Sequence, residues 1–415
     1  MEIIHYSKKT NSNLIYKFLA LWIFPGLYFS AILINQPEEF LVAIGQLIGW
    51  INIIAALIII AKGLKGSLFL PIVTFLLISS KLARVFTNSE IIELFYITVL
   101  NVIICIVGSI IICQHPKIIY KQVSIISILN LLLMFLQVVG VGAWTQILTT
   151  YSEDKNANPI DTLFIQEVDL IYRLEQLRPS GFSHSTVLLT LILVFSLTLH
   201  YCSFSRKSNW MTPILCALVV LSMGKMVFGI FLLLIIYYFL FGSKKEYITA
   251  KFSALYFIIF IVIYLILFPG LFAINLSVDT LLSSFLIRIS DIVLTFNPSS
   301  SIFVNVHGYT TINAFNLDAG ENISGFSVLV KNLESVVFFF SIFSILYLYG
   351  FMKMHLFFPE LAKLASLTFI VVMILPFMHS FWSTQIYWFI VGVGILPIFY
   401  LFKPSFILNM KRINL

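Results

Sequence analysis

The sequence predicts an all-α polytopic integral membrane protein, and three observations predict it. Of the 415 residues, 60% are hydrophobic and only 10% are charged. Soluble domains average about 45–50% apolar and about 25% charged residues, so hydrocarbon is the main solvent of this chain. Apolar runs near spanning length recur along the whole sequence. The charges between these runs segregate by sign, as they do around membrane helices.

Twelve segments are candidate transmembrane helices, because each approaches the roughly 20 apolar residues that a bilayer requires. They are residues 15–35, 40–61, 67–80, 91–113, 123–143, 186–203, 210–223, 226–242, 253–275, 335–352, 363–379 and 385–402. Segments 67–80 and 210–223 are short, so the predicted number is about 12, with a range of 10–12. No small-residue cleavage site follows the first apolar run, so we expect no removable signal peptide.

The charge distribution predicts the orientation. If both termini are cytoplasmic and all twelve segments cross, 17 of the 25 basic residues lie inside and 15 of the 18 acidic residues lie outside. This follows the positive-inside rule. The inner basic residues are spread over several loops and both tails, so nothing supports nucleic-acid binding. The four cysteines lie in or beside apolar runs and form no CxxC pair, which indicates neither a disulfide framework nor a zinc site.

Two outward loops, residues 144–185 and 276–334, interrupt an otherwise single transmembrane domain over 1–415. Long loops in a compact protein are usually functional or disordered. Residues 160–178 carry apolar side chains at helical spacing, which predicts an amphipathic helix that ends before Pro179. The second loop opens with a similar helix, in which Arg288 and Asp291 share a face. We therefore expect both loops to be ordered.

Arginine and lysine are distributed differently. With this topology 15 of the 19 lysines are inside, whereas four of the six arginines are outside. Arg173, Arg178 and Arg288 fall in the two long loops. A guanidinium group binds phosphate in a bidentate way and stays charged at any relevant pH, so these arginines suit a diphosphate. The alternative is that they form ion pairs, Arg288 with Asp291 and Arg173 with Asp169.

Four motifs give the chain a resemblance to a known family. They are RPSGF at 178–182, LSMGKMVFGIFLLLI at 221–235, Arg288 followed by Asn297-Pro298 and His307-Gly308-Tyr309, and Glu334-Ser335 before an apolar run, where the family has Glu-x-Gly. With the two large loops, they resemble bacterial O-antigen and capsule repeat-unit polymerases of the Wzy type and, more distantly, O-antigen ligases. Three departures stand beside the likeness. The chain has His184-Ser185-Thr186 where relatives often have Glu-Pro-Ser, Val336 replaces a glycine, and a late His-Asn pair is absent.

The resemblance implies a GT-C-like glycosyltransferase bundle in the bacterial inner membrane, active at its periplasmic face. A glycan would move from undecaprenyl diphosphate to a hydroxyl of a second lipid-linked repeat unit. Fixed cations would stabilise the diphosphate that leaves. The loops hold no Asp-x-Asp, so we expect no metal and no cofactor. The expected partners are the lipid-linked oligosaccharide, membrane lipid, a chain-length regulator and a flippase.

The resemblance also implies site residues. The expected catalytic residues are Arg178, Arg288, His307 and His184, and the expected substrate-binding residues are Arg173, Gly181, Lys225, Tyr309, Asp291 and Glu167. Plainer roles stay open beside these and beside the ion pairs named above. His184 can belong to a helix cap, His307 can be an ordinary loop histidine, and Gly181 can serve to turn the chain after Pro179.

Two other functions stay open. An O-antigen ligase passes the glycan to the lipid A core, and a flippase exports the same lipid-linked unit. Flippases of that kind have short loops and charges that line a central cavity. Here the segment centres are nearly free of charge and the outward loops are long. These features favour chemistry at the outer face over transport.

Overall fold

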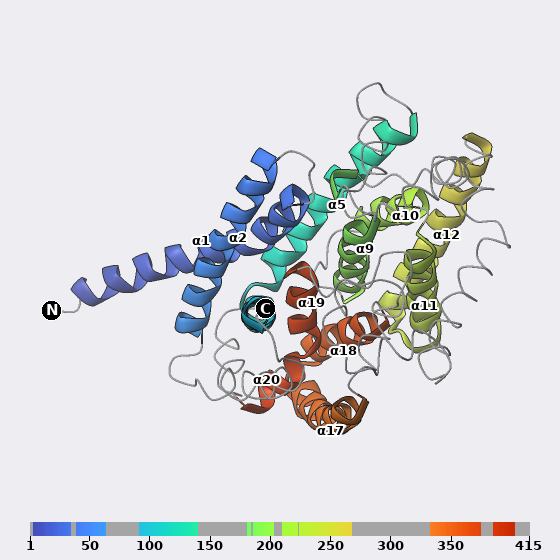
Figure 1. Cartoon of the computed structure of the whole chain (residues 1–415). Helices are drawn as coiled ribbons and strands as arrows, with labels where there is room; N and C mark the ends of the chain where they lie inside the picture. The colour runs from blue at the N-terminus through green and yellow to red at the C-terminus, as the bar shows by residue number, and fades with distance from the viewer. Residues whose placement is uncertain are drawn as a thin grey trace, which may run out of the picture. The chain divides into compact units, whose positions relative to one another are not determined.

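Helices form every regular element in the described part of the computed structural model (Figure 1). The structure describes residues 3–34, 39–63, 91–139, 181–183, 186–202, 210–222, 224–267, 333–374 and 385–402. Its elements are α1 (Ile3–Ile34), α2 (Glu39–Gly63), α4 (Ile91–Gln114), α5 (Pro116–Val139), the 3-10 turn η2 (Gly181–Ser183), α9 (Thr186–Tyr201), α10 (Met211–Ser222), α11 (Lys225–Phe241), α12 (Lys244–Leu267), α17 (Leu333–Phe357), α18 (Pro359–Ile374), α19 (Gln385–Gly394) and α20 (Leu396–Phe402). For these residues the all-α prediction is confirmed.

The described helices are those of a membrane protein. Four are long and apolar enough to cross a bilayer, over Lys17–Ile34, Glu39–Ala61, Pro116–Val139 and Glu246–Leu267. Only 22% of the last span is buried inside the protein, and all but one of its exposed side chains, Lys251, are large and apolar. Exposure of such an apolar surface is unfavourable in water and is typical of a helix that faces lipid. Five shorter apolar helices accompany these four.

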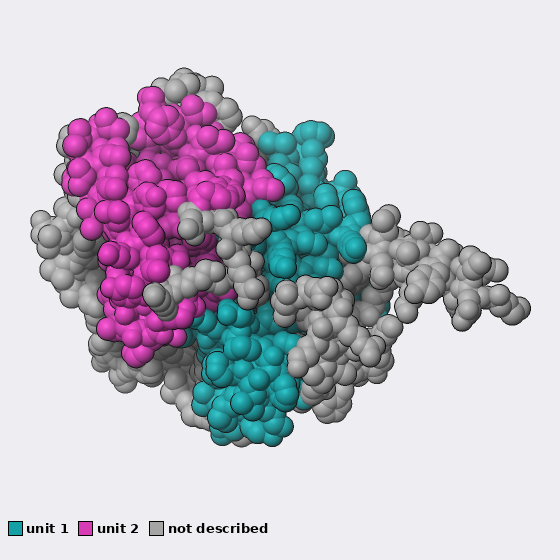
Figure 2. All heavy atoms as spheres, turned by 180° about the vertical axis from the view of Figure 1, so that it is seen from behind, with its two compact units in different colours: residues 1–122, 339–372, 382–415 teal, residues 123–338, 373–381 magenta. Residues whose placement is uncertain are grey.

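The chain divides into two compact units, each built from segments distant in sequence (Figure 2). Unit 1 comprises residues 1–122, 339–372 and 382–415, and unit 2 comprises residues 123–338 and 373–381. Helix α5 contributes its first residues to unit 1 and the remainder to unit 2. The expected single domain over 1–415 stays a prediction. The two expected loops lie outside the described residues except for η2 and the first two residues of α17, Leu333 and Glu334.

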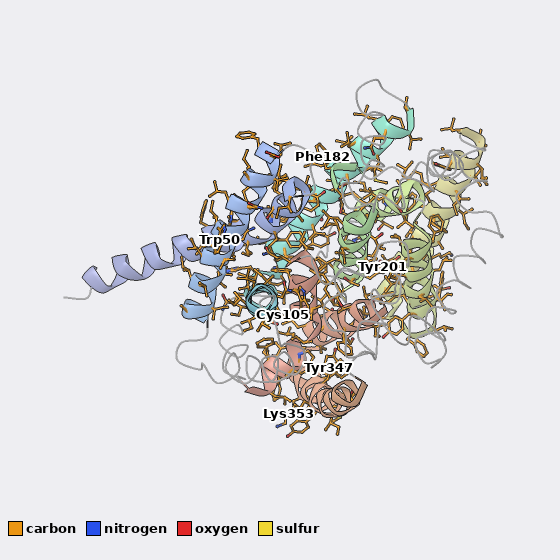
Figure 3. All side chains as sticks on the ribbon, viewed as in Figure 1. Trp50, Cys105, Phe182, Tyr201, Tyr347 and Lys353 are labelled. Carbon is orange, nitrogen blue, oxygen red and sulfur yellow. The ribbon has the colours of Figure 1, made fainter. Side chains whose placement is uncertain are left out.

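Small residues bring the helices of unit 1 close together. Ser30 Oγ of α1 donates a hydrogen bond of 2.8 Å to the carbonyl oxygen of Gly45 in α2. Helix α4 packs on α19, where Ser109 Oγ donates to the carbonyl oxygen of Gly392. Lipid tails are as apolar as leucine, so helices in a membrane associate through close packing and such hydrogen bonds. Figure 3 shows Cys105 of α4 at this contact.

Helix α9 is the centre of unit 2. All residues from Leu188 to Tyr201 are buried, as expected of a helix that is apolar on every side. At its C-terminal end, His200 Nε2 lies 3.0 Å from Thr212 Oγ1 of α10. The next residue, Tyr201, stacks on Tyr238 near the end of α11, with ring centroids 5.0 Å apart (Figure 3). The C-terminal ends of α9 and α11 therefore meet.

Several helix boundaries differ from the sequence prediction, and two of the differences have a clear local cause. Helix α12 begins at Lys244 rather than at residue 253, because Ser243 and Glu246 form half of a capping box. The backbone N–H of Ser243 donates to Glu246 Oε2 at 2.8 Å. The segment 385–402 is two helices, α19 and α20, which are separated at Ile395. Pro397 explains this break, since proline has no N–H for the next helical hydrogen bond.

A single residue, His115, joins α4 to α5 in unit 1. Its backbone N–H donates to the carbonyl oxygen of Ile111 at 2.7 Å, and its own carbonyl oxygen accepts from Ile118 and Ile119. The imidazole is partly buried. Burial, and then the positive charge of Lys17, lower the pKa of His115. The folded chain therefore favours the neutral imidazole.

This lowered pKa predicts a stability that depends on pH. The unfolded chain binds the His115 proton more readily, so the stabilising effect is complete above the ordinary pKa of about 6.5. It is lost as the pH falls through the lower pKa of the folded state. We expect the melting temperature of the purified chain in detergent to fall between pH 7.5 and 5. The fall should be smaller in His115→Gln and in Lys17→Met than in the parent. A fall as large as that of the parent in both variants would contradict the assignment.

Candidate functional site

The candidate site is centred on η2, the turn that begins at Gly181 of the RPSGF motif. Gly181 has a φ of 61°, in the left-handed region that favours glycine. A Cβ atom at this position would lie 2.5 Å from Asn130 Oδ1 and 3.1 Å from the Asn130 carbonyl oxygen. Both the backbone conformation and the close approach to α5 therefore require glycine.

Two side-chain amides of α5, Asn130 and Gln137, hold this turn, and we call them the amide clamp. The backbone N–H of Gly181 donates to Gln137 Oε1 at 3.0 Å. Ser183 donates to Asn130 Oδ1 twice, from its backbone N–H at 3.3 Å and from its Oγ at 3.2 Å. The Nδ2 atom of Asn130 donates to the carbonyl oxygen of Ile126 at 2.8 Å, which is consistent with Oδ1 facing the turn.

The amide clamp is buried, which makes its hydrogen bonds important. Asn130 is 0% exposed, Ser183 1% and Gln137 3%. A backbone N–H that is removed from water needs a partner, and away from regular helix a side-chain oxygen can supply it. Leaving such a donor unsatisfied costs about 1–3 kcal/mol. The turn therefore depends on the two amide oxygens of α5.

The same contacts show how the chain passes α5. Ser127 Oγ lies 2.9 Å from Ser196 Oγ, Asn130 contacts Ser183, and Gln137 contacts Gly181. Residues further along α5 contact residues earlier in the segment 181–196, so α5 and that segment run in opposite directions. The residues that follow Val139 and those that precede Gly181 thus leave and enter the described structure at one end of α5. This is the arrangement that the predicted loop 144–185 requires.

The junction of α10 and α11 forms a second part of unit 2. Residues 223–224 join the two helices. Ser222 Oγ accepts from the Gly224 N–H at 3.4 Å and donates to the Val219 carbonyl oxygen. Lys225 is the first residue of α11. It therefore lies at the N-terminal end of α11. Gly181 likewise precedes the N-terminal end of α9. The C-terminal ends of α9 and α11 meet, as the stacking of Tyr201 on Tyr238 shows.

The predicted site residues divide into two groups. The structure describes Gly181 and the backbone of Lys225. The others lie outside the described residues, and their roles stay predictions: Arg173, Arg178, His184, Glu167, Arg288, Asp291, His307 and Tyr309. Gly181 was predicted as a substrate-binding residue, with a turn as the plainer role. Its buried backbone N–H donates to Gln137 Oε1 within the turn, and a role in substrate binding stays a prediction.

Sequence reasoning missed the amide clamp, although a signal was present. Ser127, Asn130 and Gln137 are three and seven residues apart, which places them on one face of α5. Neutral polar side chains in an apolar segment usually face the interior of a helix bundle. In the structure this face of α5 makes the hydrogen bonds to Ser196, Ser183 and Gly181.

The described interior carries neutral polar groups. Its buried polar residues are Ser, Thr, Asn, Gln and one histidine, with no buried Asp, Glu, Lys or Arg in the described ranges. Within these ranges no three His, Cys, Asp or Glu residues come together as a metal site would need. In three comparisons, the chain matches no protein-family model, no curated protein and no solved structure.

Proposed function

We propose that this chain is a surface-polysaccharide polymerase of the Wzy type. It would be a GT-C-like bundle of about 12 transmembrane helices in the bacterial inner membrane. It would transfer a growing glycan from undecaprenyl diphosphate to a new lipid-linked repeat unit. In that transfer an acceptor hydroxyl attacks the donor's anomeric carbon, the bond from that carbon to the diphosphate oxygen breaks, and the hydroxyl proton passes to a base.

One observation carries the proposal: the RPSGF motif ends in a turn that α5 holds by three hydrogen bonds. A motif in an unconstrained loop would need no such clamp. Arg178 precedes Gly181 by three residues, which span at most about 11 Å. The clamp thus supports a fixed place for a guanidinium group near the end of the bundle.

The proposed roles follow from charge chemistry. Arg178 and Arg288 would bind the diphosphate in a bidentate way as its negative charge develops, and Lys225 would add a third positive charge. His307 and His184 are the proposed bases for the acceptor hydroxyl, with Glu167 and Asp291 as carboxylate alternatives. Arg173, Gly181 and Tyr309 would contribute to substrate binding.

The described helices favour this proposal over a flippase. A transporter of charged lipid-linked units is expected to line its path with ionisable side chains. The interior described here is lined with uncharged polar groups and one histidine. A ligase stays an alternative, because its chemistry would use the same diphosphate leaving group.

Lipopolysaccharide gels test the proposed function. We expect deletion of the gene to remove the ladder and to leave a single repeat unit on the core. Complete loss of O-antigen, including the single unit, would instead indicate a ligase or a flippase. Complementation with Arg178→Lys or Arg288→Lys should abolish or strongly reduce the ladder, because lysine keeps the charge and loses the bidentate fork. Normal ladders in both variants would reject the site assignment.

A further inference from the structure

The amide clamp takes no direct part in the chemistry proposed above, yet it holds the turn of the RPSGF motif by three buried hydrogen bonds. Asn130 and Gln137 are seven residues apart, or about 10.5 Å along α5. Together they bind both ends of the three-residue turn, Gly181 through Gln137 and Ser183 through Asn130. Attachment at two points fixes the direction of the turn as well as its location.

A separate hydrogen bond links α5 to α9 apart from this clamp. It joins Ser127 Oγ and Ser196 Oγ, which are 2.9 Å apart. The turn, by contrast, adopts a left-handed conformation at Gly181 and brings its backbone against Asn130. A chain that only had to enter α9 could do so without this conformation. The clamp therefore fixes the turn itself, which begins three residues after Arg178 in the sequence.

We propose that Asn130 and Gln137 are positioning residues that hold the Arg178-bearing segment in place for diphosphate binding. This inference rests on the proposed function for its activity readout. Gln137 is the decisive member, because its Oε1 accepts from Gly181. Its buried Nε2 donates to none of the described residues, so the acceptor and donor roles of this amide can be separated by substitution.

Maleimide labelling of Ser183→Cys measures whether the turn is docked. Ser183 is 1% exposed, and the substitution keeps the backbone hydrogen bond to Asn130. The four native cysteines are free and buried, so a polar maleimide reports on position 183 in detergent-solubilised chain. We expect slow labelling in the parent, and labelling about tenfold faster or more when Gln137→Leu removes the acceptor.

Two further variants make the test specific. Gln137→Glu keeps a carbonyl acceptor, since a buried carboxyl is held neutral, and it replaces the amide NH2 by a single O–H. Ser127→Ala is the matched control, because it breaks a hydrogen bond of the same helix pair without touching the turn. We expect slow labelling and a normal ladder in both of these variants. Gln137→Leu should lose the ladder while the chain stays in the membrane at the parental amount.

Two results would overturn the assignment. One is slow labelling and a normal ladder in Gln137→Leu. The other is slow labelling with a lost ladder in Gln137→Glu, which would mean that activity depends on the Gln137 amide itself and not on docking of the turn. Failure of the proposed function is distinguishable, because the labelling difference between Gln137→Leu and Ser127→Ala is measured without any polysaccharide. An unchanged ladder in the deletion strain would reject the function and leave the docking result standing.

Discussion

Gly392→Ala is expected to destabilise the chain severely, because α4 and α19 approach each other too closely for a side chain. A Cβ atom at Gly392 would meet the carbonyl oxygen of Cys105 and lie 2.7 Å from its carbonyl carbon. Gly108 faces α19 in the reciprocal way, against the backbone of Phe389. The obstructing atoms are backbone, so the helices themselves would have to separate. Overpacking of a buried site costs typically about 1–3 kcal/mol, and a backbone clash belongs at the upper end.

The loss extends beyond the clash. Separation of the helices also lengthens the hydrogen bond from Ser109 Oγ to the Gly392 carbonyl oxygen and disturbs the contact of Phe389 with Phe24 of α1, whose ring centroids are 5.4 Å apart. We expect a much lower yield of monodisperse protein in detergent and a lower melting temperature. Gly108→Ala should behave in the same way.

Gly229→Ala is the matched control for these substitutions. Gly229 also lies within an apolar helix, α11, but a Cβ atom there meets nothing within 4 Å. Alanine also has the higher helix propensity, so this variant should melt at or slightly above the parental temperature. Equal melting temperatures for Gly392→Ala and Gly229→Ala would show that α4 and α19 are not in close contact.

The sequence predicted where helices occur better than it predicted how they pair. Of the twelve expected segments, all but 67–80, which lies outside the described residues, overlap a helix, and 385–402 overlaps two. This success has a simple cause, since a bilayer fixes the length of an apolar run. The errors are at boundaries where local chemistry decides, such as the capping box at Ser243 and Glu246 and the break before Pro397. Both signals are present in the sequence.

Pairing could not be predicted, because a transmembrane helix is apolar on every side. Nothing in α4 or α19 alone indicates that Cys105 and Gly392 meet across most of the chain length. Small residues mark possible contacts, but each helix carries several of them. The site shows the same limit. RPSGF marked the turn, whereas its partners Asn130 and Gln137 are distant in sequence and became evident only from the three-dimensional contacts.

Gly181→Ala is the second substitution with a large expected effect, and here the effect is on activity. Alanine at a φ of 61° costs roughly 1–2 kcal/mol relative to ordinary helical backbone. Its Cβ atom would also lie 2.5 Å from Asn130 Oδ1. The turn can relieve both only by leaving α5, and it then loses its three hydrogen bonds to the amide clamp. We expect fast maleimide labelling of Ser183→Cys and loss of the polysaccharide ladder, while the chain stays in the membrane.

Gly181→Asn separates the two causes of this effect. Asparagine tolerates the left-handed conformation better than other residues with a side chain. If conformation alone excluded alanine, asparagine would restore slow labelling and the ladder. We expect no rescue, because its Cβ atom occupies the same place against Asn130 as that of alanine. Normal ladders in Gly181→Ala would contradict the role of the turn, whereas loss in both variants with normal ladders in Gly229→Ala would identify close approach to α5 as the decisive requirement.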